Sequence, residues 1–190
     1  MNIQTNCALP SGRCLDQEFR LTVYEAGHAL SARAMSLRII SLRMLPRPPM
    51  LVSDKTVAGN TINSLIQTLE NRVVELFGGQ IAEEYICASH SCCSGDVSRI
   101  DELARLIAGL TGVEDSDLVW FELEDLAHGI FENEQYKDAI LPIAEFLHKK
   151  TLEGADTIDG EELERELDKY VPPLEQKRSL SRFFGFSGRK

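Results

Sequence analysis

Residues 24–30 read Tyr-Glu-Ala-Gly-His-Ala-Leu and lie in a proline-free stretch from Asp16 to about Leu37. Apolar residues recur along this stretch at intervals of three and four, which predicts an amphipathic helix. Residues four apart share one helical face, and the motif H-E-x-x-H uses this spacing to hold zinc between two histidines beside a glutamate general base. Here Glu25 and His28 fill the second and last positions of the motif, and Tyr24 fills the first. The segment therefore predicts the helix of a zinc site with one ligand changed.

Composition limits the classes of protein to consider. A chain of 190 residues fits one domain, and a net charge of −10 argues against nucleic acid, because phosphate binding needs a basic face. We find no apolar run long enough for a signal peptide or a membrane span. The five cysteines are odd in number and include the adjacent pair Cys92 and Cys93, so we expect reduced thiols and a cytoplasmic location.

Three regions differ along the chain. Residues 1–15 mix Asn, Pro, Gly and Cys without periodicity and are expected to be a flexible lead. Residues 16–172 form the domain. Residues 173–190 form a basic tail that contains Phe183, Phe184 and Phe186, and the part from Glu175 onward carries a charge of +4, which leaves −14 for residues 1–174. The tail has the composition of a docking or disordered segment.

The domain is predicted to be mainly α with a small β element. Residues 38–45 alternate, with Ile40, Leu42 and Met44 on one face, and predict a short strand. A proline-rich loop is expected from residue 46 to about 59. Helices are expected at about residues 61–85, 96–110, 116–131, 134–152 and 160–170.

Cap residues and glycines refine these helices. Thr61 or Asn60 can cap the second helix, and Asp159, followed by Glu162, can cap the last one. Gly78-Gly79 is expected to interrupt the second helix. Because two glycines within a helix are costly, they indicate close packing against another helix, most plausibly the one that bears Glu25.

Four segments, in order, resemble the peptidase domain of the FtsH-type membrane-bound ATP-dependent zinc proteases. The first is residues 24–30 (family pattern HEAGHAL), the second is Leu45-Pro-Arg47 after a strand, and the third is residues 77–84, Phe-Gly-Gly-Gln-Ile-Ala-Glu-Glu. The fourth is residues 157–163, Thr-Ile-Asp-Gly-Glu-Glu-Leu. Asp96 follows the third segment, near the place where the family has an aspartate ligand. The resemblance covers roughly residues 18–170.

The resemblance implies a helical peptidase-type domain in which His28 and Asp96 are zinc ligands and Glu25 is the general base. A catalytic zinc needs three protein ligands and an open position for water. Tyr24 stands at the first-ligand position, and a neutral phenol is a poor zinc ligand at pH 7. We therefore expect zinc to be weakly bound or absent. We find no ATPase domain and no phosphate-binding loop motif in these 190 residues, so we expect them to hold no ATP site.

Two functions follow from this set of residues. One is a pseudopeptidase that binds a peptide or protein partner, with the hydroxyl of Tyr24 hydrogen-bonded to Asp96 or His28. The other is an ATP-independent metalloendopeptidase whose zinc site is completed by His90, Cys92 or Cys93. Whether the chain is an enzyme stays open, and so does a homo-oligomer.

Separately, each residue has a structural role that it can fill without a metal. Asp96 is a good N-cap residue for the helix that it opens. Glu25 would be an exposed or salt-bridged helix carboxylate. The segment after Pro46 and Arg47 is short and proline-rich, so pairing of a substrate with an edge strand is in doubt.

Overall fold

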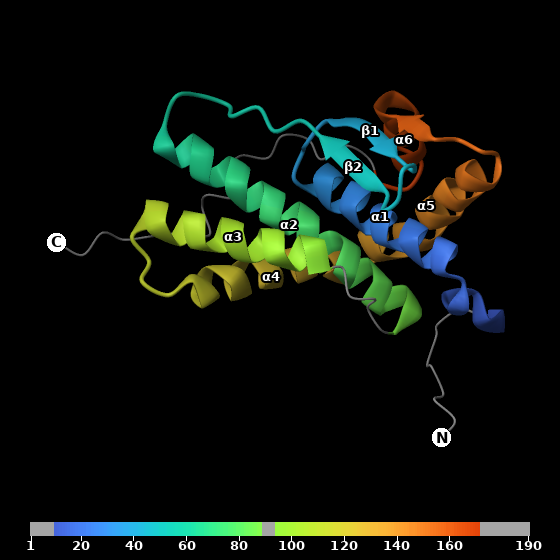
Figure 1. Ribbon diagram of the computed structural model, residues 1–190, viewed down its shortest axis with the longest axis horizontal. Coiled ribbons are helices and arrows are strands. Elements are labelled where there is room, and N and C mark those ends of the chain that lie inside the picture. The colour runs from blue at the N-terminus through green and yellow to red at the C-terminus, as the bar shows by residue number, and fades with distance from the viewer. Residues whose placement is uncertain (1–9, 89–93, 172–190) are drawn as a thin grey trace, which may run out of the picture.

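The computed structural model describes residues 10–88 and 94–171. It is mainly helical with a small antiparallel sheet of three strands, as the sequence predicts. Figure 1 shows the helices running alongside one another, with the sheet against one end of α1. The elements are η1 (Pro10–Leu15), α1 (Gln17–Ala34), β1 (Ile39–Arg43), β2 (Met50–Ser53), α2 (Ile62–Cys87), α3 (Ser94–Thr111), α4 (Ser116–Glu132), α5 (Glu134–Leu152), β3 (Thr157–Asp159) and α6 (Gly160–Leu167).

Side-chain caps fix the beginnings of several helices. Asp16 accepts a hydrogen bond from the backbone N–H of Glu18, and Thr61 accepts one from that of Ser64. Asp159 caps α6 by accepting from Glu161. Each cap satisfies an N–H group that has no partner within its helix. The predicted caps at Thr61 and Asp159 are thus confirmed.

The glycines of α1 and α2 let the two helices cross at backbone contact. A Cβ atom on Gly27 would lie 2.1 Å from the carbonyl oxygen of Gly78, and a Cβ on Gly78 would lie 2.6 Å from that of Gly27. Close packing against the helix that bears Glu25 is therefore confirmed. The predicted interruption is wrong, because α2 runs unbroken through Gly78-Gly79. Burial of the crossing compensates for the low helix propensity of glycine.

The sheet has the order β2-β1-β3, with antiparallel pairing throughout. A β-bulge between Ile39 and Ser41 shifts the alternation of β1, so that Ile39 is buried and Ile40 is 49% exposed. The prediction that Ile40 shares the buried face of Leu42 and Met44 is therefore wrong. The loop expected after residue 46 contains β2, and β3 precedes the last helix.

The core lies where α1 meets α2, α4, α5 and the sheet. Its largest fully buried side chains include Phe19, Phe77 and Phe131, from three different helices. No helix within the described ranges is long and apolar enough to cross a membrane.

Two expectations about the chain need correction. Residues 10–15 form the 3-10 helix η1, where a flexible lead was expected, while residues 1–9 lie outside the described residues. Cys87 is a free, buried thiol, but Cys14 is disulfide-bonded, so the expectation of reduced thiols does not hold there. The tail, residues 173–190, also lies outside the described residues.

The helix crossing predicts a sharp difference between two glycines. Gly78→Ala places a Cβ 2.1 Å from the hydroxyl oxygen of Ser31 and against the Gly27 backbone, so the free energy of unfolding should fall by about 1–3 kcal/mol or more. Gly109→Ala on α3 is the control, because its Cβ would meet nothing within 4 Å. That change should be neutral or stabilising by up to about 1 kcal/mol. Denaturant unfolding of both variants measures the contrast, and equal unfolding midpoints would contradict the tight crossing.

Candidate functional site

The buried face of α1 brings Tyr24, Glu25 and His28 together, and the first turn of α3 supplies Asp96. Tyr24, Glu25 and His28 are 6%, 3% and 5% exposed. The hydroxyl of Tyr24 donates a hydrogen bond of 2.7 Å to Oδ2 of Asp96, and Nε2 of His28 lies 3.4 Å from the same oxygen. The expected clustering and the expected Tyr24 hydrogen bond are both confirmed. The site is therefore a compact polar cluster between two helices.

α2 fixes the imidazole of His28 from the other side. Nδ1 lies 2.7 Å from the carbonyl oxygen of Glu75, which can only accept, so Nδ1 carries a proton. A Cβ on Gly79 would lie 2.8 Å from Nε2 of His28 and 2.7 Å from the Tyr24 ring, so the glycine makes room for both rings. The two rings meet edge to face, with centroids 4.6 Å apart. The orientation of His28 thus depends on backbone contact between α1 and α2.

The positive charge of His28 and the negative charge of Asp96 stabilise each other. Burial alone would lower the pKa of His28, but the contact with Asp96 and the charges of Glu25 and Asp96 outweigh it and raise the pKa to about 9. Burial opposes ionisation of Asp96, yet hydrogen bonds from His28 and Tyr24 hold its pKa below the usual value. His28 is therefore an imidazolium at neutral pH and Asp96 its carboxylate partner.

Glu25 differs from its neighbours because part of its carboxylate has no partner. Burial raises its pKa to about 7, although the charge of His28 and the backbone N–H of Leu51 act in the opposite direction. Its Oε2 atom is buried and accepts no hydrogen bond from any residue that the structure describes. The expectation of an exposed or salt-bridged Glu25 is wrong. A buried oxygen without a donor is costly, so Glu25 is the strained member of the cluster in terms of hydrogen bonding.

A cleft of about 560 Å³ opens next to Glu25 and Tyr24. One side of the cleft is formed by α1 and by Gly95 and Asp96 at the start of α3. The opposite side is formed by the β1–β2 hairpin. The residues that line this wall are Arg43, Pro46, Arg47, Pro48, Pro49 and Met50. The segment that the sequence identified only as a proline-rich loop thus forms one side of the cleft.

Sequence reasoning missed several groups that hold the site. Glu75 is fully buried, receives a 2.7 Å hydrogen bond from Ser53 and pairs with Arg72. Its carbonyl oxygen and the N–H of Leu51 are backbone groups, which no side-chain pattern reveals. The only sequence signal was a charged residue in the otherwise apolar α2 segment Val73–Phe77. His90, Cys92 and Cys93 lie outside the described residues.

The fit of this cluster to zinc is incomplete. Two ligands at about 2.0–2.2 Å from a tetrahedral zinc lie about 3.4 Å apart, which is the separation of His28 Nε2 and Asp96 Oδ2. Tyr24, which stands where the motif has its first histidine, is instead a hydrogen-bond donor to Asp96. Within residues 10–88 and 94–171 no three His, Cys, Asp or Glu side chains are grouped to hold a metal. The described residues therefore offer two groups at a suitable separation, His28 Nε2 and Asp96 Oδ2, one fewer than a catalytic zinc requires.

Comparison of the chain with protein-family models and with curated proteins finds no match.

The polar cluster predicts a specific pH dependence. Because the pKa of His28 rises from 6.5 to about 9 on folding, its stabilising effect is complete below pH 6.5 and is lost as the pH rises to 9. The free energy of unfolding should fall by about 1–3 kcal/mol across this window. Asp96→Asn removes the anion, so the His28 pKa should fall below 6.5 and this part of the pH dependence should disappear.

NMR titration of the His28 ring, with unfolding measured at pH 6.5 and 9, checks this expectation. Asp101→Asn is the matched control, because it makes the same change on α3 at a residue that pairs only with Arg105 at the surface. A His28 pKa near 6.5 in the parent protein, or one that Asp96→Asn leaves unchanged, would show that Asp96 does not stabilise the imidazolium.

Proposed function

We propose that this chain is a peptidase-like binding domain, a pseudopeptidase that takes an extended peptide or protein segment into the cleft beside Glu25. The observation that carries the proposal is the 2.7 Å hydrogen bond from Tyr24 to Asp96. It ties the residue at the first-ligand position to the aspartate that the family resemblance assigns to zinc. The cluster is then held by hydrogen bonds and charge rather than by a metal.

The shape of the cleft supports a peptide as the occupant. β2 lies at one edge of the sheet and, among the described residues, pairs only with β1. An extended segment gains main-chain hydrogen bonds when it adds to such an edge. Leu21, Met50 and three prolines supply apolar contact area in the same cleft, and Glu25 Oε2 can accept a ligand N–H. Pairing of a peptide with β2 stays a prediction, supported by the position of β2 at the sheet edge and of Met50 in the cleft wall.

A second function, an ATP-independent metalloendopeptidase, is favoured by two specific observations. The separation of His28 Nε2 from Asp96 Oδ2 suits a tetrahedral metal, and Glu25 is a buried carboxyl with a pKa near 7 beside the cleft, as a general base requires. His90, Cys92 or Cys93 would supply the third ligand. The proposal and this alternative differ in metal content.

The cellular location also stays a prediction. The composition predicted a cytoplasmic protein, whereas the disulfide at Cys14 is more typical of oxidising compartments.

Substitution at Tyr24 distinguishes the two functions. We expect the parent protein, purified without added zinc, to carry far less than one zinc per chain. Tyr24→His should raise zinc affinity by roughly 10–100-fold or more, because it restores a third ligand. Tyr24→Phe is the matched control, since it removes the hydroxyl without supplying a ligand and should gain no zinc. Metal analysis and calorimetric zinc titration of the three proteins measure this.

One result would overturn the metal-independent cluster, and a second would overturn Tyr24 as the residue that prevents metal binding. Stoichiometric zinc in the parent protein, lost in a His90→Ala, Cys92→Ala or Cys93→Ala variant, would establish the metalloendopeptidase. No gain of zinc in Tyr24→His would show that the positions of His28 and Asp96 are unsuited to a metal for reasons other than Tyr24.

Binding at the cleft is testable with an unfolded polypeptide. Fluorescein-labelled, reduced casein should bind the parent protein without being cleaved. Met50→Glu places a charge on the cleft wall and should weaken binding by roughly tenfold. Leu152→Glu is the control, because Leu152 is also an exposed apolar residue, 72% accessible, but lies outside the cleft. Fluorescence anisotropy gives the affinities and gel electrophoresis reports cleavage. Equal affinities for the two variants would exclude the cleft as the binding site.

A further inference from the structure

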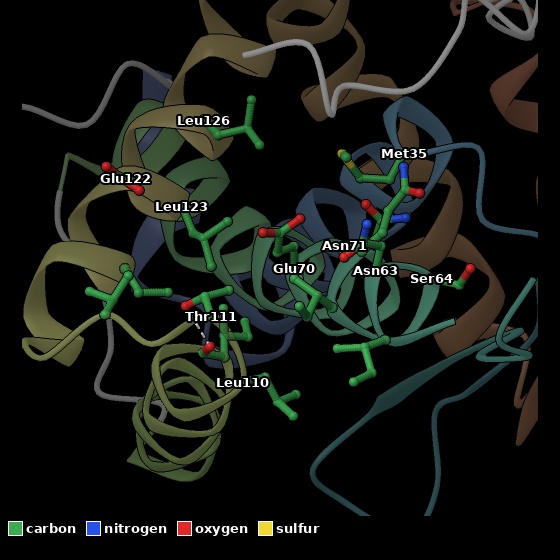
Figure 2. Close-up of a pocket in the computed structure, with 16 residues that line it drawn as sticks. Met35, Asn63, Ser64, Glu70, Asn71, Leu110, Thr111, Glu122, Leu123 and Leu126 are labelled. Atoms are coloured by element: carbon green, nitrogen blue, oxygen red, sulfur yellow. Dashed lines mark hydrogen bonds between the residues drawn. The ribbon is translucent and has the colours of Figure 1, made fainter. Parts of the chain in front are cut away.

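A second groove, of about 700 Å³, lies between the first turns of α2, the end of α3 and the first half of α4 (Figure 2). It shares no lining residue with the cleft beside Glu25. Its partly exposed apolar side chains include Leu110 and Leu126, Met35 from the end of α1 also contributes, and polar residues such as Asn63 and Asn71 lie among them. The groove is therefore a separate surface of mixed apolar and polar character, whose occupant need not be that of the cleft.

Two carboxylates give this groove a negative charge. Glu70 of α2 and Glu122 of α4 both line it, and no Lys, Arg or His does. Burial raises the pKa of Glu70, and the charge of Glu122 raises it further. Neither carboxylate has an ion-pair or hydrogen-bond partner in the described parts of the chain. A ligand that is both cationic and apolar would neutralise the two repelling carboxylates and contact the apolar side chains of the groove.

The chain itself contains a segment of this chemistry. After Val171 the remaining 19 residues carry five cations and one anion, and they include three phenylalanines around one arginine: Arg182, Phe183, Phe184 and Phe186. Phenylalanine rings can pack against the leucine side chains of the groove, and arginine can form ion pairs with its two carboxylates. The rest of the chain is strongly acidic, so this cationic segment is complementary to it in charge.

The place where the tail begins is also suitable. Asp168, three residues before Val171, pairs with Arg33, and Met35, two residues beyond Arg33, lines the groove. The tail thus follows a segment that contacts the same end of α1 from which Met35 lines the groove. The 11 residues from Val171 to Arg182 can span about 36–40 Å when extended, which is about the length of α2 at 1.5 Å per residue. The tail is therefore long enough for Arg182 to reach the groove.

We propose that this groove binds the basic, phenylalanine-containing tail of the same chain, residues 177–186. The phenylalanine rings lie against Leu110 and Leu126, and the basic side chains face Glu70 and Glu122. The groove and tail together form an intramolecular docking site, independent of the cleft and of whether that cleft binds a peptide or a metal.

Photo-crosslinking within the full chain tests the proposal. Phe184 is replaced by p-benzoylphenylalanine, which remains aromatic, and crosslinked peptides are identified by mass spectrometry after irradiation. Crosslinks should map to residues 62–71 and 107–126. An equimolar mixture of ¹⁵N-labelled and unlabelled protein should give crosslinks within a chain only. Crosslinks elsewhere, or crosslinks that join labelled to unlabelled chains, would overturn docking in the same chain, the second result in favour of a second copy.

Charge reversal tests the role of the carboxylates. Glu70→Lys with Glu122→Lys should lower the yield of groove crosslinks by roughly tenfold or more, because like charges then face one another. Asp125→Lys is the matched control, since it reverses a charge on α4 at an exposed residue that does not line the groove. A circular dichroism melt verifies that each variant is folded. Equal crosslink yields from the folded double variant and the control would overturn the assignment of Glu70 and Glu122 as partners of the tail.

Discussion

The backbone contact between Gly27 of α1 and Gly78 of α2 is the constraint on which the site depends. With any larger residue at either position the helices would move apart, because an added Cβ would overlap a carbonyl oxygen of the other helix. This close approach brings the Glu75 carbonyl within 2.7 Å of His28 Nδ1. The proton on Nδ1 is thereby fixed, and Nε2 is directed at Asp96. One helix crossing thus decides the orientation of the central imidazole.

Within the resulting cluster, Tyr24, His28 and Asp96 stabilise one another through charge and hydrogen bonds. Asp96 accepts from Tyr24 and faces the imidazolium of His28, whose other nitrogen donates to Glu75. A buried imidazolium without an anion would be costly, and so would a partly buried carboxylate without donors. The hydroxyl of Tyr24 supplies one of those donors. Charge and hydrogen bonding therefore hold Tyr24, His28 and Asp96 together.

The sequence predicted those features that depend on side-chain patterns. Helical periodicity, the caps at Thr61 and Asp159 and the helix packing at Gly78 follow from local chemistry, and the clustering of Tyr24, His28 and Asp96 followed from the order of the matched segments. Features that depend on backbone pairing were missed. β2 and β3 are four and three residues long, too short to show an alternation, and the bulge that exposes Ile40 reverses the apparent pattern of β1. The two neighbouring carboxylates, Glu70 and Glu122, come from α2 and α4, and no periodicity in the sequence reveals that these helices are in contact.

The hydrogen bonds of the site indicate which of its atoms could still accept a bond from a ligand. Tyr24, His28 and Asp96 already pair with one another or with the backbone of α2, whereas Glu25 Oε2 is buried without a donor among the described residues. Glu25 also lines the cleft of about 560 Å³ whose other side is the β1–β2 hairpin. Under the proposed function, a peptide N–H that enters this cleft would satisfy the oxygen and remove the cost of an unpaired buried acceptor. The residue that a peptidase would use as a base would then serve as the acceptor for a bound peptide.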